Sequence, residues 1–337
     1  MFTSPQPACR RAFLKTGSAA VLGLLATPAL VRRAEAALPV TVASLMAPDK
    51  PETLIWNHIA STVEAKLPGS FRFNIVPNAA LGAEREVAQA AKLGSVQASL
   101  STISVISGWV PEAQIFDLPF LFRDAAHLKA AGEGEVGEDI RAKLADQGFV
   151  VPAYINYGAR HLLTRSPITD PSGLKGLNMR VIQSPLHTEL WKAYGANPIG
   201  IPIAETYNAL QTGVADAMDL TKSAYAGFKL YEVVPCLTET AHVWAGGVIY
   251  FAQPFWRRLN DEQKQVLTEA AVEGADYFNG LMVADEETSM ALATAGGAQV
   301  FQPTDREAWV AGARPVWDRI APNVGGAERI EQIRSMS

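Results

Sequence analysis

Strand and helix patterns alternate along this chain, and the alternation occurs twice. Between residues 71 and 75 apolar and polar side chains alternate, which is the period of a half-buried strand. Residues 51–67 carry apolar side chains at helical spacing and stop at Pro68-Gly69. The first unit is predicted to run strand, helix, strand, helix, strand over residues 40–45, 51–67, 71–75, 84–93 and 96–103. Such alternation predicts an α/β domain.

A second unit of the same kind follows a polar helical stretch that ends at Gly148 and a buried strand predicted over 149–156. Its strands and helices are predicted at 178–181, 184–195, 204–212 and 215–219. Two long segments come next, an extended run over 231–241 and a helix over 261–295 with Asn260 and Gln263 spaced for a capping box. Thr304 and Glu307 are spaced to cap one more helix.

The first 36 residues have the order of a cleavable export signal. Adjacent Arg10 and Arg11 precede an apolar stretch over 18–30, which is shorter than the roughly 20 residues that span a bilayer. Small residues at 34 and 36 suit a signal peptidase. The paired arginines favour a twin-arginine signal, with an ordinary secretory signal as the alternative, and both lead to the periplasm. No later segment has a transmembrane pattern, so direct membrane insertion is not expected.

Charge and cysteine content narrow the possible partners of the exported part. Residues 37–337 contain 24 Lys and Arg against 33 Asp and Glu, a balance that disfavours nucleic acid and anionic membranes. Only Cys236 remains after the signal, so no internal disulfide is available. An anion site in so acidic a chain has to be built from a few specific cations. Individual arginines are therefore worth following.

The usual sequence signatures of catalysis are missing. The five histidines are widely spaced, with no H-E-x-x-H and no cysteine partner, so no metal site is predicted. The chain has no G-x-x-x-x-G-K-[ST], no G-x-G-x-x-G after a strand and no G-x-S-x-G. We therefore predict neither an enzyme nor a cofactor.

Five fragments stand out along the chain for their order and spacing. They are Ala80 to Glu86 (A-L-G-A-E-R-E), Ile115 to Leu121 (I-F-D-L-P-F-L), Gly158 to His161 (G-A-R-H), Leu174 to Val181 (L-K-G-L-N-M-R-V) and Glu205 to Asp216 (E-T-Y-N-A-L-Q-T-G-V-A-D). Together they resemble the solute receptors of tripartite ATP-independent periplasmic (TRAP) transporters, in the dicarboxylate-receptor family. The resemblance covers essentially all of residues 38–330.

The resemblance implies that Arg180, in the L-K-G-L-x-x-R-V run, forms a bidentate salt bridge to a ligand carboxylate. A planar guanidinium at a strand end matches a carboxylate with two parallel hydrogen bonds, whatever the family. The alternative is a solvated arginine or a simple ion pair. Arg160 is expected to reach the same carboxylate or only to pair with an acid. Thr102, with Ser101 and Ser104, ends a strand where the family places side chains that face the ligand.

Three further residues complete the predicted site. Many relatives carry an asparagine where this chain has Leu220, so that contact does not carry over. Asp219 is expected to receive a ligand hydroxyl, or else to pair with Arg180 or Lys222. Tyr207 and Trp244 are candidates for aromatic walls of the cleft, although an aromatic residue in a run such as 243–250 is more often part of the core.

The resemblance and the repeated units together predict a two-lobed α/β protein of the periplasmic-binding-protein type II class. Lobe one is predicted at 38–157 plus 246–285 and lobe two at 158–245 plus 286–330, with a ligand cleft between them and a hinge of several crossovers. The expected function is capture of a small organic carboxylate (a dicarboxylate, a 2-oxo or hydroxy acid, or a sugar acid) for TRAP membrane subunits. The alternatives are a receptor serving a sensor or an ATP-driven importer, and a periplasmic enzyme acting on an organic acid.

Overall fold

The computed structural model describes residues 37–336, and the predicted export signal over 1–36 lies outside the described residues. The nine strands of this part are β1 (Leu38–Ala43), β2 (Phe71–Val76), β3 (Ala98–Thr102), β4 (Phe149–Thr164), β5 (Asn178–Val181), β6 (Asn197–Gly200), β7 (Ala217–Thr221), β8 (Cys236–Ala252) and β9 (Gln299–Phe301). All belong to one hydrogen-bonded sheet, in the order β2-β1-β3-β8-β4-β7-β5-β6, with β9 paired to β8.

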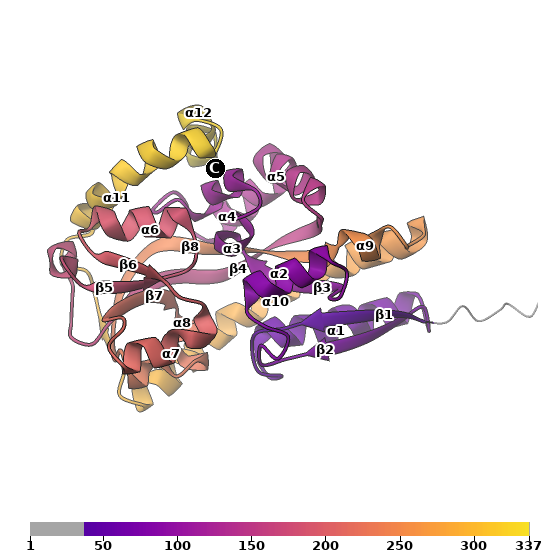
Figure 1. Ribbon diagram of the computed structural model, residues 1–337, viewed down its shortest axis with the longest axis horizontal. Helices are drawn as coiled ribbons and strands as arrows, with labels where there is room; N and C mark the ends of the chain where they lie inside the picture. Colours follow the sequence, from indigo (N-terminus) through magenta and orange to yellow (C-terminus); the bar gives the residue numbers. More distant parts are fainter. Residues whose placement is uncertain (1–36, 337) are drawn as a thin grey trace, which may run out of the picture. The chain divides into compact units, whose positions relative to one another are not determined.

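Helices connect and cover these strands (Figure 1). The α-helices are α1 (Pro51–Lys66), α2 (Glu84–Lys92), α3 (Ile103–Ile106), α4 (Ala125–Glu133), α5 (Glu135–Asp146), α6 (Pro185–Ala193), α7 (Ile203–Gln211), α8 (Lys222–Gly227), α9 (Gln253–Trp256), α10 (Asp261–Ala295), α11 (Arg306–Ile320) and α12 (Ala327–Arg334). Short 3-10 turns lie at Pro111–Asp117, Pro171–Leu174, Leu230–Glu232 and Ala321–Asn323. None of the helices within 37–336 combines the length and the apolar composition required to cross a bilayer.

Two long antiparallel strands, β4 and β8, hold the sheet together. The parallel strands β1, β2 and β3 attach along the C-terminal part of β8, because β3 pairs with Gly247 to Phe251. The parallel strands β5, β6 and β7 attach along the C-terminal part of β4, because β7 pairs with Arg160 to Thr164. Two β-α-β halves therefore share these two strands, which confirms the predicted two-lobed α/β class with more than one crossover.

The pairing of β4 with β8 is interrupted where the two halves meet. A register shift between Asn156 and Ala159 inserts a bulge, and Gly158 within it has a φ of 96°. A bulge bends its strand and redirects the next side chains, so the G-A-R-H fragment turns at this point. The predicted lobe boundaries at 157/158 and 245/246 fall at this bulge; they remain a prediction.

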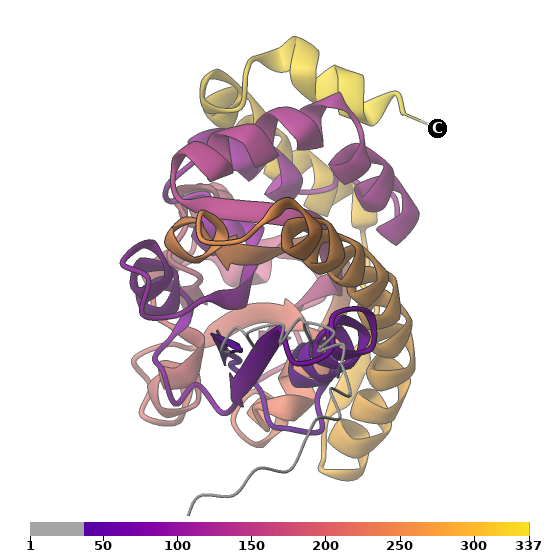
Figure 2. The ribbon, with the colours of Figure 1, turned by 90° about the vertical axis from the view of Figure 1, so that its right-hand side faces the viewer.

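Helix α10 has the bounds that the sequence predicted, and its first turn carries the predicted capping box of Asn260 and Gln263. This long helix, orange in Figure 2, packs against α1, β4 and α8, which belong to different halves. The buried core includes Trp56, Trp191 and Trp309, each at most 1% exposed.

Several predicted boundaries were wrong. The strand predicted over 149–156 continues to Thr164, and the extended run predicted over 231–241 begins at Cys236 and continues to Ala252. Both strands are longer than predicted because each pairs with a further strand in its additional part: β4 pairs with β7, and β8 pairs with β3. Local periodicity does not reveal such pairing. Thr304 does not cap α11: Asp305 is the N-cap and accepts from the backbone N–H of Ala308. Strands β6 and β9 were not predicted, since each is short.

Candidate functional site

A cavity lies where β1, β3, β5 and β7 end, next to β4 and β8, and encloses about 730 Å³ of empty space when the open solvent at its mouth is included. Ligands of open α/β sheets bind beyond the carboxyl ends of the strands, because loops and helix starts there leave side chains free. The lining residues are Ala43, Ser44, Leu45, Met46, Glu52, Glu84, Ser99, Leu100, Thr102, Tyr157, Arg160, Arg180, Ile182, Ile203, Leu220, Thr221, Ala224, Phe228 and Ala245.

Arg180 projects into this cavity from β5, where β6 and β7 pair with it on either side. Its side chain is buried, and its Nε donates to the backbone carbonyl of Ile201 at 2.9 Å. Burial, followed by the neighbouring Arg160, lowers the pKa of Arg180 to about 10, so the guanidinium stays charged at neutral pH. No carboxylate in the described part of the chain lies within 4.0 Å of it. Asp219 and Glu84 act on its charge only from beyond that distance, and its two terminal nitrogens donate to no group within residues 37–336, which leaves them for a ligand anion.

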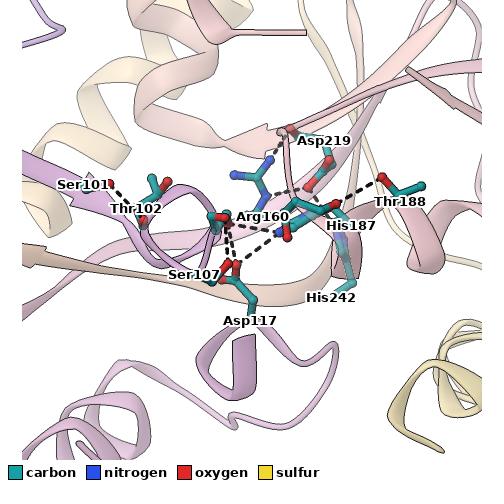
Figure 3. A network of polar contacts seen from close by, with 11 residues as sticks. Ser101, Thr102, Ser107, Asp117, Arg160, His187, Thr188, Asp219 and His242 are labelled. Carbon is teal, nitrogen blue, oxygen red and sulfur yellow. Dashed lines mark hydrogen bonds and ion pairs between the residues drawn. The ribbon is translucent and has the colours of Figure 1, made fainter. Parts of the chain in front are cut away.

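Arg160 reaches the cavity from β4, just after the bulge, and its guanidinium is held by Asp219, which does not line the cavity. Its Nε lies 2.5 Å from Oδ2 of Asp219, and its Nη2 donates to the Asp219 carbonyl at 2.8 Å (Figure 3). The antiparallel register of β4 and β7 makes this pair possible, because it sets Leu162 opposite Asp219. Two hydrogen bonds from one guanidinium to one residue fix its plane. Arg160 is thus oriented before any ligand arrives.

Asp219 lies behind Arg160 and does not line the cavity. Its carboxylate also lies 3.3 Å from Nε2 of His242, whose Nδ1 is 2.7 Å from the Thr240 hydroxyl. Burial alone would raise the pKa of Asp219, but Arg160 and then His242 outweigh it and hold that pKa well below its usual range. The predicted alternatives for Asp219, pairing with Arg180 or Lys222, were wrong: the residue pairs with Arg160. Lys222 instead pairs with Glu239 at 2.8 Å and Glu286 at 3.1 Å.

Thr102 closes β3 at the cavity, as the sequence suggested. Its backbone N–H donates to Oε1 of Glu84 at 2.6 Å, and its buried hydroxyl has no partner within residues 37–336. Of its neighbours, the Ser101 hydroxyl donates to the Thr102 carbonyl at 3.1 Å and the Ser104 hydroxyl to Asp117 at 2.5 Å. Among these three hydroxyls, that of Thr102 is the one left for a ligand.

Tyr207 and Trp244 do not line the cavity, which corrects their predicted role as its walls. Tyr207 lies on α7 and its hydroxyl donates to Glu232 at 2.7 Å. Trp244 is partly buried against the main core, on the stretch of β8 that pairs with Ala159. Side chains alternate between the two faces of a strand, and it is Ala245, the next residue, that reaches the cavity.

Glu52, Glu84 and Tyr157 line the cavity and were not predicted as site residues. Glu84 stands in the A-L-G-A-E-R-E fragment, which was a usable signal. Burial raises its pKa, and hydrogen bonding by Thr102, followed by the charges of Arg180 and Arg160, offsets this only in part. Glu52 lies in the first turn of α1, where an acidic residue is common and signals nothing more. Tyr157 lies at the bulge of β4, whose position could not be read from the sequence.

A buried Ser-His-Asp cluster lies beside the site without the geometry of a catalytic triad. The Ser104 hydroxyl donates to Oδ2 of Asp117, and Nε2 of His187 lies 3.2 Å from that hydroxyl. The same ring nitrogen of His187 lies 3.4 Å from Oδ2 of Asp117 (Figure 3). In a triad the carboxylate binds the other ring nitrogen, which frees the first to accept the serine proton. None of the three residues lines the cavity. Within residues 37–336, no group of three or more His, Cys, Asp or Glu side chains could hold a metal ion.

Comparison with known proteins gives consistent matches. The family model described as "Bacterial extracellular solute-binding protein, family 7" matches residues 42–323. A solute-binding protein of Verminephrobacter eiseniae is 32% identical over 277 residues, which is 82% of each chain. A TRAP periplasmic solute-binding protein of Polaromonas sp. JS666, bound to D-erythronate, superimposes with a TM-score of 0.86 at 25% identity, over 89% of this chain and 99% of that one. Its counterpart from Shewanella oneidensis, with bound succinate, gives 0.84 at 26% identity, over 89% and 98%.

Proposed function

Since the chain belongs to family 7 of the bacterial extracellular solute-binding proteins, we propose that it is the periplasmic receptor of a TRAP transporter and binds a small organic carboxylate. The observation that carries this proposal is Arg180, a buried guanidinium that faces the cavity and has no carboxylate of residues 37–336 within 4.0 Å. Arg160 adds a second cation whose plane is already set by Asp219. A ligand carboxylate between the two arginines would supply the missing anion.

The arrangement of the strands supports a receptor that closes on its ligand. The cavity is lined from both β-α-β halves, since Thr102 lies on β3 and Arg180 on β5. A ligand that contacts both halves stabilises the closed form relative to the open one, and so shifts the hinge equilibrium. Membrane subunits that recognise the closed form would then receive only loaded receptors.

The same observations favour binding over catalysis. An enzyme that cleaves an organic acid by covalent catalysis needs an activated nucleophile aimed into the cavity. The one Ser-His-Asp cluster described above lies outside the lining, and its serine and histidine compete for one carboxylate oxygen. The lining instead offers two cations, two acids and several hydroxyls around apolar side chains, a composition suited to reversible binding.

Calorimetry on the exported protein, residues 37–337, tests the proposed function. We expect at least one acid from a panel of dicarboxylates, hydroxy acids and sugar acids to bind in the micromolar range or tighter, and Arg180→Ala to abolish the binding. Uptake of that acid by whole cells should collapse with an ionophore and persist when ATP is depleted, which separates a TRAP transporter from an ATP-driven importer. A wild-type protein that binds none of the acids would refute the proposal.

We also propose export by the twin-arginine route, on the strength of Arg10 and Arg11. The double variant Arg10→Lys with Arg11→Lys should leave precursor in the cytoplasm, whereas the wild-type protein should be recovered from the periplasm beginning near Ala37. Cell fractionation followed by N-terminal sequencing measures both. Normal export of the double variant would show that an ordinary secretory signal is at work.

A further inference from the structure

The charged side chains of the cavity are not all paired. Arg160 and Arg180 are the only Lys or Arg side chains of the described residues that line it, and Asp219 pairs with Arg160. Arg180 has no such partner, because Glu84 acts on both arginines but forms no ion pair within 4.0 Å with either. A ligand with a single carboxylate can pair with Arg180, whereas a second carboxylate would enter a buried site that holds Glu52 and Glu84 and no further cation.

Glu52 lines the cavity from the first turn of α1. Its backbone carbonyl accepts from the hydroxyl of Ser44 at 3.3 Å, and Ser44 also lines the cavity. Arg160 and Arg180 line it from β4 and β5, and within residues 37–336 neither forms an ion pair with Glu52. A ligand held by the two arginines in this cavity can therefore also contact Glu52.

One oxygen of the Glu52 carboxylate is a buried acceptor without a hydrogen-bond donor. The residue is 8% exposed, and its buried Oε2 has no hydrogen-bond partner within residues 37–336. The nearest cation does not serve it, because Lys50 pairs with Asp285 at 3.1 Å. Burial raises the pKa of Glu52 to about 7, which reflects how poorly its charge is compensated. A buried acceptor left in this state costs free energy that a ligand donor would recover.

We propose that Glu52 is a specificity-determining residue, which accepts a hydrogen bond from a ligand hydroxyl and excludes a second carboxylate of the ligand. This inference rests on the proposed function. The geometry then assigns the ligand to the hydroxylated monocarboxylates, the class of the aldonic and uronic acids. The unpartnered hydroxyl of Thr102 and the carboxylate of Glu84 provide further polar partners for ligand hydroxyls. Apolar side chains such as Ile182, Leu220 and Phe228 cover the carbon skeleton between them.

Matched pairs of acids test this assignment directly. D-erythronate and meso-tartrate share a four-carbon chain with the same inner hydroxyls, and D-gluconate and D-glucarate share a six-carbon chain with the same inner hydroxyls, so within each pair a second carboxylate replaces only the terminal hydroxyl. By calorimetry at pH 7.5, the wild-type protein should bind a hydroxy acid at least about tenfold more tightly than its dicarboxylate partner, since one hydrogen bond to a charged group is involved. This comparison needs no variant, so it holds even if a substitution at Glu52 disturbs folding.

Glu52→Gln keeps the size of the side chain and removes its charge. It should weaken binding of the hydroxy acid by roughly ten- to a hundredfold and narrow the gap to the dicarboxylate, because the amide can donate to a carboxylate. The control is Glu64→Gln on the exposed side of the same helix, which should change neither affinity.

Three outcomes would overturn the assignment. meso-Tartrate or D-glucarate bound as tightly as its partner would refute it while leaving the proposed function intact, provided that Arg180→Ala abolishes that binding. An unchanged preference in a folded Glu52→Gln would remove Glu52 from ligand selection. Binding of 4-aminobutyrate in preference to D-erythronate, lost in Glu52→Gln, would show that the donor is an ammonium group.

Discussion

Arg180→Lys tests whether the charge of this residue or its planar fork is what binds the ligand. In the structure Nε is occupied by the carbonyl of Ile201 at 2.9 Å, which leaves the two terminal nitrogens for a carboxylate. Lysine keeps the charge but has a single nitrogen, so one of two charged hydrogen bonds is lost. A hydrogen bond to a charged group contributes roughly 1.5–3 kcal/mol, so we expect a loss of about 2 kcal/mol, roughly thirtyfold in affinity.

The measurement is calorimetric titration of wild type, Arg180→Lys and Arg180→Ala with the best-bound acid of the panel. Arg180→Ala should bind nothing measurable, because the ligand carboxylate would be buried without its cation. Arg72→Lys, an exposed change on β2, is the matched control and should bind like wild type. Circular dichroism must show the same fold in all four proteins. Wild-type affinity in a folded Arg180→Lys would refute bidentate binding, and wild-type affinity in Arg180→Ala would remove Arg180 from the site.

Three further predictions concern the anchor, the bulge and the hinge. Asp219→Asn leaves the buried Arg160 without its ion-pair partner and should destabilise the protein by about 3–5 kcal/mol at neutral pH. The pKa of Asp219 is lower in the folded protein than in the unfolded chain, so the stabilisation by this carboxylate is complete above the unfolded pKa and is lost as the pH falls through the folded pKa. Urea unfolding curves of wild type and Asp219→Asn that stay equally far apart in acid would contradict this. Gly247→Ala would place its Cβ 2.4 Å from the Tyr157 ring, so we expect a loss of roughly 1–3 kcal/mol by thermal unfolding together with weaker ligand binding; wild-type values for both would exclude the clash. The radius of gyration from X-ray scattering should fall when saturating acid is added, and an unchanged radius with ligand bound would argue against closure.

Features that depend on neighbouring residues were readable from the sequence. The capping box of Asn260 and Gln263 and the apolar spacing behind it placed α10 correctly at both ends, because caps and helical faces involve residues a few positions apart. The two β-α-β units and the placement of Arg180 on a short strand followed from the same local patterns, together with the family resemblance.

Features that depend on residues far apart in the chain were decided by the tertiary structure. Arg160 and Asp219 are 59 positions apart, and only the register of β4 on β7 makes them partners. The sequence alone therefore could not exclude Arg180 or Lys222 as the partner of Asp219. The same holds for the bulge that aims Arg160. Glu52 illustrates the difference most clearly. In the sequence it is an ordinary acidic residue in the first turn of a helix. It becomes an unpaired acceptor in a cavity only because residues from much later in the chain, such as Leu220 and Phe228, line the same cavity.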